Sequence, residues 1–464
     1  MVIKTDVVVI GGGPAGSATA TLIAQAGHDV TLIEKDVFPR YKIGESLLPS
    51  TVGNMAEILG VISKFQQAGF QVKRGATFSW GKNPDRLWNF NFGGSASERL
   101  ETVASTPFAY NVDRSKFDQI LLENALDVGV EVHQGCAVTA LDESDSRVKG
   151  VVFRDSEGNS HSIEASIVVD ASGQKSSIAK KVGRRKLSQF FEKVAVWTYF
   201  EGAGRLNRPL DGNVLFQAID DSWLWYVPMS NDLTSVGIVC PPNELPKDQQ
   251  VLETFLLNKV EECSHVKALV SQGQRAKKPP YNSVRVCSEY SYCYTKFWKP
   301  GLALVGDSAC FVDILLASGV HMALYGALLL SQSINTILTF GLAEEIALNE
   351  YEIRIRKEYA RFYNGLLELF DSSLDETEYI NRLRLLLFDT SGISIDDMES
   401  AAAKHTSQGS LRKESSHALD ELRKYNSEQL LYNPMTPKKE PLPNIPCFLN
   451  ASQSKRFWNM PNYQ

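Results

Sequence analysis

The chain has 464 residues, enough for two or three domains with sizeable cores. Hydrophobic residues make up 43% and charged residues 22%, which is typical of a globular protein. The net charge of -6 argues against a protein that binds nucleic acid through electrostatics.

Cysteine usage and the N-terminus bear on location. Seven cysteines lie at irregular spacing without a Cys-x-x-Cys pair, so we expect neither a disulfide framework nor a metal site. No cationic segment or cleavage site precedes the first apolar run, and we therefore predict a cytoplasmic location. The most apolar long stretch, 319–340, is interrupted by polar side chains, so a buried helix is expected rather than a membrane span.

The first 35 residues predict a βαβ unit. Residues 6–10 form an apolar run that suits a strand buried on both faces of a parallel sheet. Residues 14–26 carry Ala and Leu at helical spacing, and Gly27 is a suitable helix end. Residues 30–33 form the second strand.

A glycine motif joins this first strand to the helix: Gly11-Gly12-Gly13-Pro14-Ala15-Gly16. Gly11 permits a tight turn, and Gly13 lets backbone amides approach a pyrophosphate at the helix N-terminus. Gly16 lets the helix pack closely on the strand. Glu34 ends the second strand, where its carboxylate can accept hydrogen bonds from ribose hydroxyls. We predict a dinucleotide site that also includes Ala15 and Lys35.

The choice between FAD and NAD depends on a second segment. Gly306-Asp307 follows a strand predicted at 302–306. In FAD enzymes of this architecture such a pair closes over the ribityl-pyrophosphate, and the dipole of the next helix stabilises negative charge on reduced flavin. Together with the N-terminal motif, this pair favours FAD.

The remaining elements predict an α/β fold in three parts. A helix at 114–128 and strands near 130–134, 137–142, 148–153 and 167–169 extend the first sheet. Residues 1–183 and 294–341 are therefore assigned to a discontinuous FAD-binding domain, and 184–293 to a mostly antiparallel substrate-side sheet. Residues 342–464 form a helical C-terminal region with a proline-rich tail, for which disorder and docking on the body are both open.

Four segments resemble the two-component flavin-dependent halogenases, which share the fold of the aromatic hydroxylases. They are Gly44-Glu45-Ser46-Leu47-Leu48-Pro49, Lys73-Arg74-Gly75-Ala76-Thr77-Phe78, Trp223-Leu224-Trp225-Tyr226-Val227-Pro228, and 306–321. The third, a Trp-x-Trp-x-x-Pro signature, is the most specific. The resemblance implies a Rossmann-like FAD domain of the glutathione-reductase and aromatic-hydroxylase type.

The resemblance also implies a reaction with two separated sites. Reduced FAD, O2 and chloride or bromide yield hypohalous acid, which travels through a tunnel to a lysine beside the substrate. Lys73 matches this catalytic lysine, which can polarise hypohalous acid as an ammonium or form a haloamine as a neutral amine. Trp223 and Trp225, on one face of a strand, are expected to keep the substrate from the flavin; plain core packing is the competing interpretation.

Further positions follow from the same resemblance. Ser318, Gly319 and Val320 are expected to bind halide through backbone amides at a helix start. The positions expected to contact FAD are Arg40, Glu45, Ser46, Arg114 and Val138, in addition to the motif residues and Asp307.

Two departures bear on the substrate. Many relatives have Asp-Pro where this chain has Asp313-Ile314, and the branch that acts on free tryptophan has a glutamate where this chain has Leu316. We therefore predict a phenolic or pyrrolic substrate, free or tethered to an acyl or peptidyl carrier protein, and a separate NAD(P)H:flavin reductase as partner. The main alternative is an FAD-dependent aromatic hydroxylase; an isoprenoid reductase and a non-catalytic flavin-binding module are more distant ones.

Overall fold

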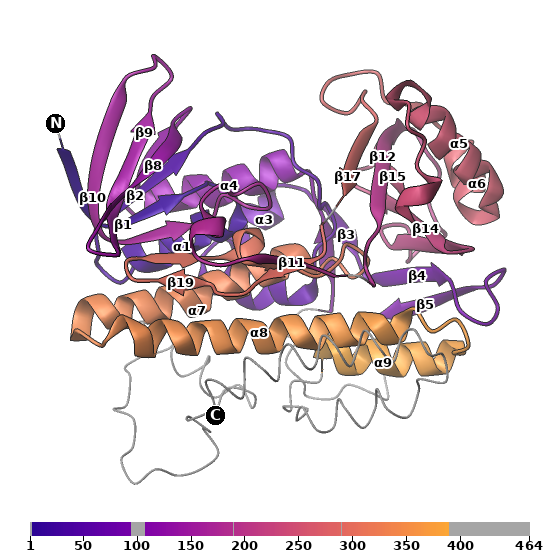
Figure 1. Ribbon diagram of the computed structural model, residues 1–464. Coiled ribbons are helices and arrows are strands. Elements are labelled where there is room, and N and C mark those ends of the chain that lie inside the picture. The colour runs from indigo at the N-terminus through magenta and orange to yellow at the C-terminus, as the bar shows by residue number, and fades with distance from the viewer. Residues whose placement is uncertain (1, 94–106, 189, 289, 389–464) are drawn as a thin grey trace, which may run out of the picture. The chain divides into compact units, whose positions relative to one another are not determined.

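The computed structural model describes residues 2–93, 107–188, 190–288 and 290–388 (Figure 1). Met1–Leu187 and Glu192–Phe388 form one compact unit, which contains every described helix and strand. The predicted helical stretch from 389 to 432 and the proline-rich tail lie outside the described residues.

The first sheet has the order β19-β20-β10-β1-β2-β7, in which β20, β10, β1, β2 and β7 run parallel and β19 is antiparallel to β20. Strands β8 and β9 form a hairpin that joins this sheet through the antiparallel pairing of β9 with β10. Its strands are β1 (Val2–Ile10), β2 (Val30–Glu34), β7 (Glu131–Gln134), β8 (Ala137–Ser144), β9 (Arg147–Arg154), β10 (Ser160–Asp170), β19 (Trp298–Lys299) and β20 (Leu302–Leu304). Residues 7–10 of β1 and all of β2 are buried on both faces, as their apolar runs predicted.

Helices α1 (Pro14–Ala24) and α7 (Ser318–Phe340) pack on each other, and α4 (Arg114–Asp127) packs on α1. Among the described residues, α7 is the helix long and apolar enough to cross a membrane by composition, yet 61% of that window is buried inside the protein. This burial confirms the predicted core helix, since a helix that is apolar around most of its surface suits a protein interior.

The second sheet has the order β16-β12-β15-β14-β13-β4-β5, with β17 beside β12. Its strands are β4 (Gly75–Ser79), β5 (Leu87–Asn91), β12 (Val194–Glu201), β13 (Val214–Ile219), β14 (Ser222–Pro228), β15 (Leu233–Cys240), β16 (Gln274–Arg275) and β17 (Arg285–Ser288). All pairings are antiparallel except that of β13 with β4. Strands β4 and β5 come from the range assigned by sequence to the FAD domain, so the second sheet is larger than the predicted 184–293.

Side chains alternate across this second sheet. Leu224 and Tyr226 of β14 belong to a core shared with α5 (Leu252–Glu262) and α6 (Ser264–Val270). Because neighbouring residues of a strand face opposite sides, Trp223 and Trp225 lie on the face turned away from α5 and α6.

Smaller elements connect the two sheets. They are η1 (Thr51–Met55), α2 (Ala56–Ile58), α3 (Ile62–Gln67), β3 (Gln71–Lys73), β6 (Ala109–Asn111), η2 (Ala179–Lys181), β11 (Arg185–Leu187), η3 (Pro242–Glu244), η4 (Gln249–Val251), β18 (Tyr292–Tyr294), η5 (Gly306–Ser308) and β21 (Cys310–Phe311). Strand β3 pairs with β6, and β18 lies between β11 and β21.

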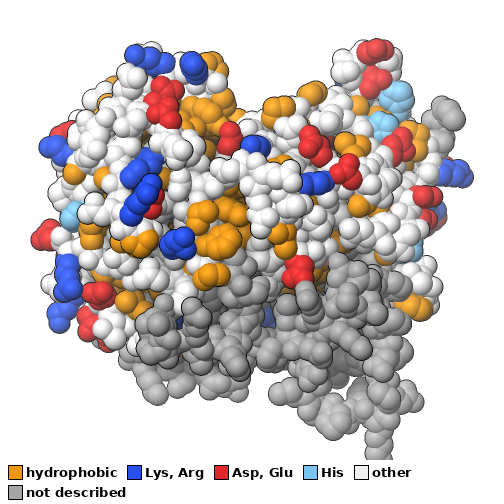
Figure 2. Space-filling model, turned by 180° about the vertical axis from the view of Figure 1, so that it is seen from behind, with side chains coloured by type: hydrophobic (Ala, Val, Ile, Leu, Met, Phe, Trp, Pro, Cys, Tyr) orange, Lys and Arg blue, Asp and Glu red, His pale blue; other side chains and the backbone are white. Residues whose placement is uncertain are grey.

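Helix α8 (Glu344–Leu369) bridges both sheets, and α9 (Glu376–Phe388) packs on it (Figure 1). Tyr351 Oη donates to Leu304 O of the first sheet at 2.7 Å. Trp80 Nε1, just after β4, donates to Leu369 O at 2.9 Å. On the face shown in Figure 2, acidic and basic side chains are interspersed and no large patch of one sign gathers, in keeping with the composition.

Candidate active site

Two glycines of the N-terminal motif are fixed by close packing. Gly11 has φ +104°, and a Cβ there would lie 2.6 Å from Ala171 O. A Cβ on Gly16 would lie 1.8 Å from Gly11 O. No larger residue fits either position, so α1 lies directly against β1 as the motif predicted.

The space at the N-terminus of α1 is open. Gly13 has an ordinary φ of -70°, and the nearest atom to a Cβ there would be Arg40 Nη2 at 3.5 Å. Helix α1 has no side-chain cap and no acid in its first turn, so its first amide groups remain available to an anion. A pyrophosphate fits this position by charge and by space.

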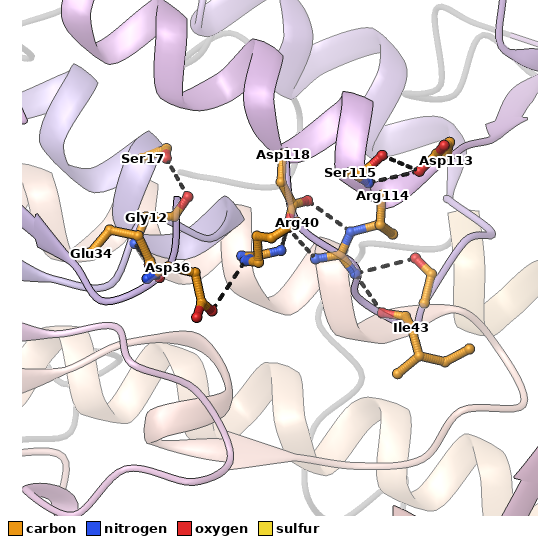
Figure 3. Close-up of polar contacts among 11 residues, drawn as sticks. Gly12, Ser17, Glu34, Asp36, Arg40, Ile43, Asp113, Arg114, Ser115 and Asp118 are labelled. Carbon is orange, nitrogen blue, oxygen red and sulfur yellow. Dashed lines mark hydrogen bonds and ion pairs between the residues drawn. The ribbon is translucent and has the colours of Figure 1, made fainter. Parts of the chain in front are cut away.

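Glu34 is held at the end of β2 (Figure 3). It is 4% exposed; Oε2 accepts from Gly12 N at 2.5 Å and Oε1 from Asp36 N at 2.9 Å. This places a carboxylate beside the α1 N-terminus, where the ribose of a dinucleotide would lie. Ala15 is buried in α1, Lys35 is exposed just after β2, and Val138 packs half-buried on the core of the first sheet.

A buried carboxylate that the sequence analysis did not select organises the next segment. Asp118 is fully buried and accepts from Arg114 Nε at 2.8 Å and from Arg40 Nη1 at 2.8 Å (Figure 3). Arg114 Nη1 also donates to the carbonyl of Ile43 at 2.8 Å. Arg40 and Arg114 therefore fix residues 40–44 against α4. The four-residue spacing of Arg114 and Asp118 on a predicted helix was the signal for this pair.

Gly306 and Asp307 return the chain to the α1 N-terminus. Gly306 has φ +62°, and a Cβ there would lie 2.8 Å from Ala15 Cβ. Burial raises the pKa of Asp307, while the positive charges of Lys42 and Arg114 oppose that rise. The structure thus brings together the predicted cofactor positions at Gly13, Glu34, Arg40 and Asp307, and FAD fits the arrangement.

Glu45 ends a chain of buried hydroxyl groups. Tyr199 Oη donates to Glu45 Oε1 at 2.7 Å, and Tyr41 Oη lies 2.7 Å from Tyr199 Oη. Trp197 Nε1 donates to Tyr41 Oη at 2.8 Å. Burial raises the pKa of Glu45, and the hydrogen bond from Tyr199 opposes the rise. The chain connects the 40–46 loop to strand β12 of the second sheet.

Lys73 is buried, with 4% of its surface exposed. Its Nζ donates to Ser46 Oγ at 2.6 Å and lies 5.4 Å from the centre of the Phe92 ring. Among the described residues no carboxylate forms an ion pair with it, and burial lowers the pKa of Lys73 to about 7. Ser46, predicted as a flavin contact, also contacts the lysine directly, a role that the sequence analysis missed.

The two signature tryptophans form part of a continuous aromatic wall. The rings of Trp223 and Trp225 are buried, with their centres 6.1 Å apart. Trp223 contacts Trp80 at 6.4 Å, and Trp225 contacts Trp197 at 6.4 Å. The hydrogen bond from Trp197 to Tyr41 connects this wall to the 40–46 loop.

Asn111 ties the lysine strands to the tryptophan strand. It is fully buried in β6, where it forms an isolated bridge with Ser46. Its Nδ2 donates to Pro228 O at 2.8 Å and to Gly212 O at 2.9 Å. The end of the Trp-x-Trp-x-x-Pro strand is therefore fixed relative to Lys73.

Residues 313–320 lead into α7 and include the three positions predicted to bind halide; we call this segment the halide turn. Ala317 has φ +55°, an uncommon left-handed conformation for a residue with a Cβ. Helix α7 has no side-chain cap and no acid in its first turn, so the amides after Ser318 have no capping acceptor. Burial raises the pKa of Asp313 to about 7, and its side chain accepts from Leu315 N at 2.8 Å. The turn is preorganised for an anion at its helix start.

His321, one residue beyond the halide turn, joins three elements. Its Nδ1 lies 2.9 Å from Ser50 Oγ, and its Nε2 lies 2.8 Å from Glu358 Oε1 on α8. Burial raises the pKa of Glu358, but Arg361 and His321 outweigh it and bring it to about 2. The imidazole therefore holds the first turn of α7 against both η1 and α8.

The fold and this site define an FAD-binding enzyme with a buried lysine and a separate buried wall of aromatic rings. The family model "Tryptophan halogenase" matches residues 6–103 and 95–386. The chain belongs to this family of flavin-dependent halogenases, whose cofactors are FAD, a halide and O2.

Individual relatives agree with this assignment. Tryptophan 2-halogenase of Chondromyces crocatus is 34% identical over 78% of this chain, which spans 65% of that relative. The pyrrole-2-carbonyl peptidyl-carrier-protein chlorinase of Pseudomonas fluorescens is 30% identical over 82% of this chain and 88% of that protein. The solved structure of the myxobacterial chondrochloren halogenase CndH has a sequence 39% identical to this chain. The match covers 86% of this chain and 89% of the CndH chain, with a TM-score of 0.77.

Proposed function

We propose that this protein halogenates a phenolic or pyrrolic ring with hypohalous acid formed from halide, O2 and reduced FAD. The burial of Lys73 carries the proposal. With 4% exposure and a pKa near 7, this lysine is not a solvated surface residue, and its amine is suited to bind an electrophilic halogen.

Bound FADH2 would supply the two electrons that, with O2, convert halide to hypohalous acid. The residues of this chain prepare that reaction. Gly13 and the α1 N-terminus would hold the pyrophosphate, and Glu34 the ribose. The halide turn would hold the halide on the backbone amides that follow Ser318, because the first turn of a 23-residue helix attracts anions.

Lys73 would receive the halogen electrophile. Ser46 Oγ, 2.6 Å from Nζ, holds the amine in place whether it is neutral or charged, since a hydroxyl group can donate or accept. A neutral amine is available near pH 7 because burial lowers the pKa of Lys73. The buried wall of Trp223 and Trp225 supports a separation between the substrate and the flavin, since large packed rings leave little space for a second aromatic ring.

The substrate class rests on Leu316. This side chain is 7% exposed in the halide turn, at the position where the tryptophan branch has glutamate. An aliphatic side chain offers no acceptor for the ammonium group of an amino acid. The relatives include enzymes named for tryptophan and for a carrier-bound pyrrole, so similarity alone supports either class; Leu316 favours a phenol or pyrrole.

Partners follow from the same proposal. A separate NAD(P)H:flavin reductase would supply FADH2, and the substrate would be free or attached to a carrier protein. We also propose a cytoplasmic location, which suits the free thiols among the described cysteines.

The test is a product analysis. The full chain is supplied with FAD, NADH, a flavin reductase and chloride or bromide, and incubated with phenols, carrier-bound pyrrole-2-carbonyl and free tryptophan. We expect mass-spectrometric evidence of halogenated phenol or pyrrole, with at least tenfold less product from tryptophan, the selectivity of about 1.4 kcal/mol that one missing polar contact gives. Tryptophan as the best substrate would refute the substrate class. Hydroxylated products that form without halide would establish the alternative, an aromatic hydroxylase.

A further inference from the structure

We infer that Cys293 and Cys310 form an oxidant-sensitive dithiol, which hypohalous acid or a peroxide converts to a disulfide. The two residues lie 17 positions apart, with no motif linking them, and the fold places them side by side. It rests on the proposed function in one respect only, namely that hypohalous acid formed during catalysis is the oxidant.

The strand register brings the two residues into direct opposition. Cys293 of β18 is the antiparallel partner of Cys310 of β21. In the adjacent pair, Tyr294 N donates to Ala309 O at 3.0 Å, which marks that pair as the hydrogen-bonded one. Since the two kinds of pair alternate, Cys293 and Cys310 form a non-hydrogen-bonded pair, with Cα atoms about 4.5 Å apart. Disulfides need Cα separations of about 4.4 to 6.8 Å, so the backbone already permits the bond.

The two thiols are chemically different. The side chains of Cys293 and Cys310 lie within hydrogen-bonding reach of each other. Arg356 Nη1 on α8 lies 3.3 Å from Cys293 Sγ, and this arginine is itself held by Glu352 at 2.7 Å. The hydrogen bond with Cys310 and the charge of Arg356 lower the pKa of Cys293 despite its burial, whereas the pKa of Cys310 is raised.

These differences assign the two roles. The thiolate is the reactive form of cysteine, so Cys293 is the nucleophile. As a residue, Cys293 also has some exposed surface, whereas Cys310 is buried. Cys310 then resolves the oxidised sulfur.

The other described cysteines lack these features. Burial raises the pKa of Cys240 and of Cys263 to about 11. Cys287 is partly exposed like Cys293, but burial raises its pKa, and its thiol contacts Gln174 rather than a second cysteine. Cys287 is therefore a matched control of similar exposure.

The oxidation balances in two steps. The Cys293 thiolate attacks the halogen of hypohalous acid, forming an S–halogen bond while the oxygen–halogen bond breaks and hydroxide leaves. The Cys310 sulfur then attacks Cys293, forming the S–S bond, while halide leaves and the Cys310 proton joins the hydroxide as water. One oxidant is consumed, both sulfurs are oxidised, and a reducing thiol restores the pair.

The position of the pair relates it to the active site. Strand β21 connects η5, which contains Asp307, to the halide turn. Cys310 is therefore three residues from each of the predicted cofactor residue Asp307 and the first residue of the turn, Asp313. Oxidant that escapes from the halide site meets a reversible acceptor within the same segment.

The experiment separates this chemistry from halogenation. The reduced full chain, without FAD reductase or substrate, is treated with one equivalent of hypochlorite or hydrogen peroxide and digested without reduction. We expect a peptide cross-link between Cys293 and Cys310 with loss of two hydrogens. Cys287 should stay at least about tenfold less modified, because burial raises the pKa of its thiol whereas the pKa of Cys293 is lowered.

Two variants sharpen the result. In Cys310→Ser, Cys293 should stop at sulfenic acid, which dimedone traps, while Cys287→Ser should form the cross-link at the wild-type rate. The inference is overturned if Cys293 and Cys287 oxidise at equal rates, or if Cys293 in the wild type proceeds to sulfinic acid without the cross-link. With reductase, FAD and chloride in place of added oxidant, and catalase present, the cross-link should also form. Failure of this last arm alone contradicts the proposed oxidant chemistry and leaves the dithiol standing.

Discussion

The buried amine of Lys73 predicts an unusual dependence of stability on pH. Burial lowers its pKa in the folded protein to about 7, whereas an unfolded chain has a lysine pKa of about 10.4. Between these values the unfolded chain binds more protons than the folded one, so stability rises with pH. Below pH 7 the amine is protonated in both states, and the burial of its charge then destabilises the folded protein to the full extent. Raising the pH from about 6 to about 9 should therefore increase the free energy of unfolding by about 3 kcal/mol through this group alone.

Lys73→Met isolates that contribution, because methionine has similar length and does not titrate. Urea denaturation followed by circular dichroism at pH 6 to 9 should show the variant most stabilised relative to wild type at pH 6. That advantage should shrink by about 3 kcal/mol at pH 9. Lys82→Met, at an exposed lysine, is the control and should leave the wild-type profile unchanged.

The pKa itself is measurable by carbon-13 NMR of the lysine ε-carbons, with the Lys73 signal identified by its loss in Lys73→Met. A titration midpoint above about 9.5, or parallel stability curves for wild type and Lys73→Met, would refute the assignment of a desolvated amine.

Three other substitutions test the cofactor and halide ends of the site. Gly13→Val should leave the circular dichroism spectrum intact but lower FAD affinity at least tenfold. The new Cβ would meet only Arg40, at 3.5 Å, and the rest of the side chain would fill the space for the pyrophosphate. Unchanged flavin binding in an absorbance titration would contradict a pyrophosphate site at Gly13. Asp118→Asn should lower the free energy of unfolding by about 3 to 5 kcal/mol, because it leaves the buried Arg114 and the partly buried Arg40 without their carboxylate. A denaturation midpoint equal to that of the wild type would contradict this. His321→Phe should raise the KM for halide about tenfold with FAD affinity unchanged, because the first turn of α7 loses its hydrogen bonds to Ser50 and Glu358. Steady-state kinetics at varied chloride concentration test this. An unaltered KM would show that His321 does not position the halide.

Local patterns in the sequence predicted the cofactor end of the molecule well. The Gly11–Gly16 motif, its flanking strands and helix, and the alternation that places Trp223 and Trp225 on one face all depend on residues close together in the chain. Periodicity and turn chemistry act over such short distances, so these elements could be assigned from residue types alone.

The contacts that complete the site join residues far apart in sequence. Lys73 meets Ser46, and His321 meets both Ser50 and Glu358. The parallel pairing of β4 with β13 likewise joins segments about 140 residues apart, which is why the range assigned by sequence to the second sheet did not include β4 and β5. Strand register and helix packing determine these contacts, and a single sequence carries no signal for either.

The most direct test of the account compares wild type with Lys73→Met under halogenating conditions, measuring bound FAD, released hypohalous acid and halogenated product in one experiment. We expect the variant to keep FAD and still release hypohalous acid, yet to form at least 100-fold less product, a loss of about 2.7 kcal/mol or more of transition-state stabilisation. Wild-type product formation by Lys73→Met would show that halogen reaches the ring without this amine.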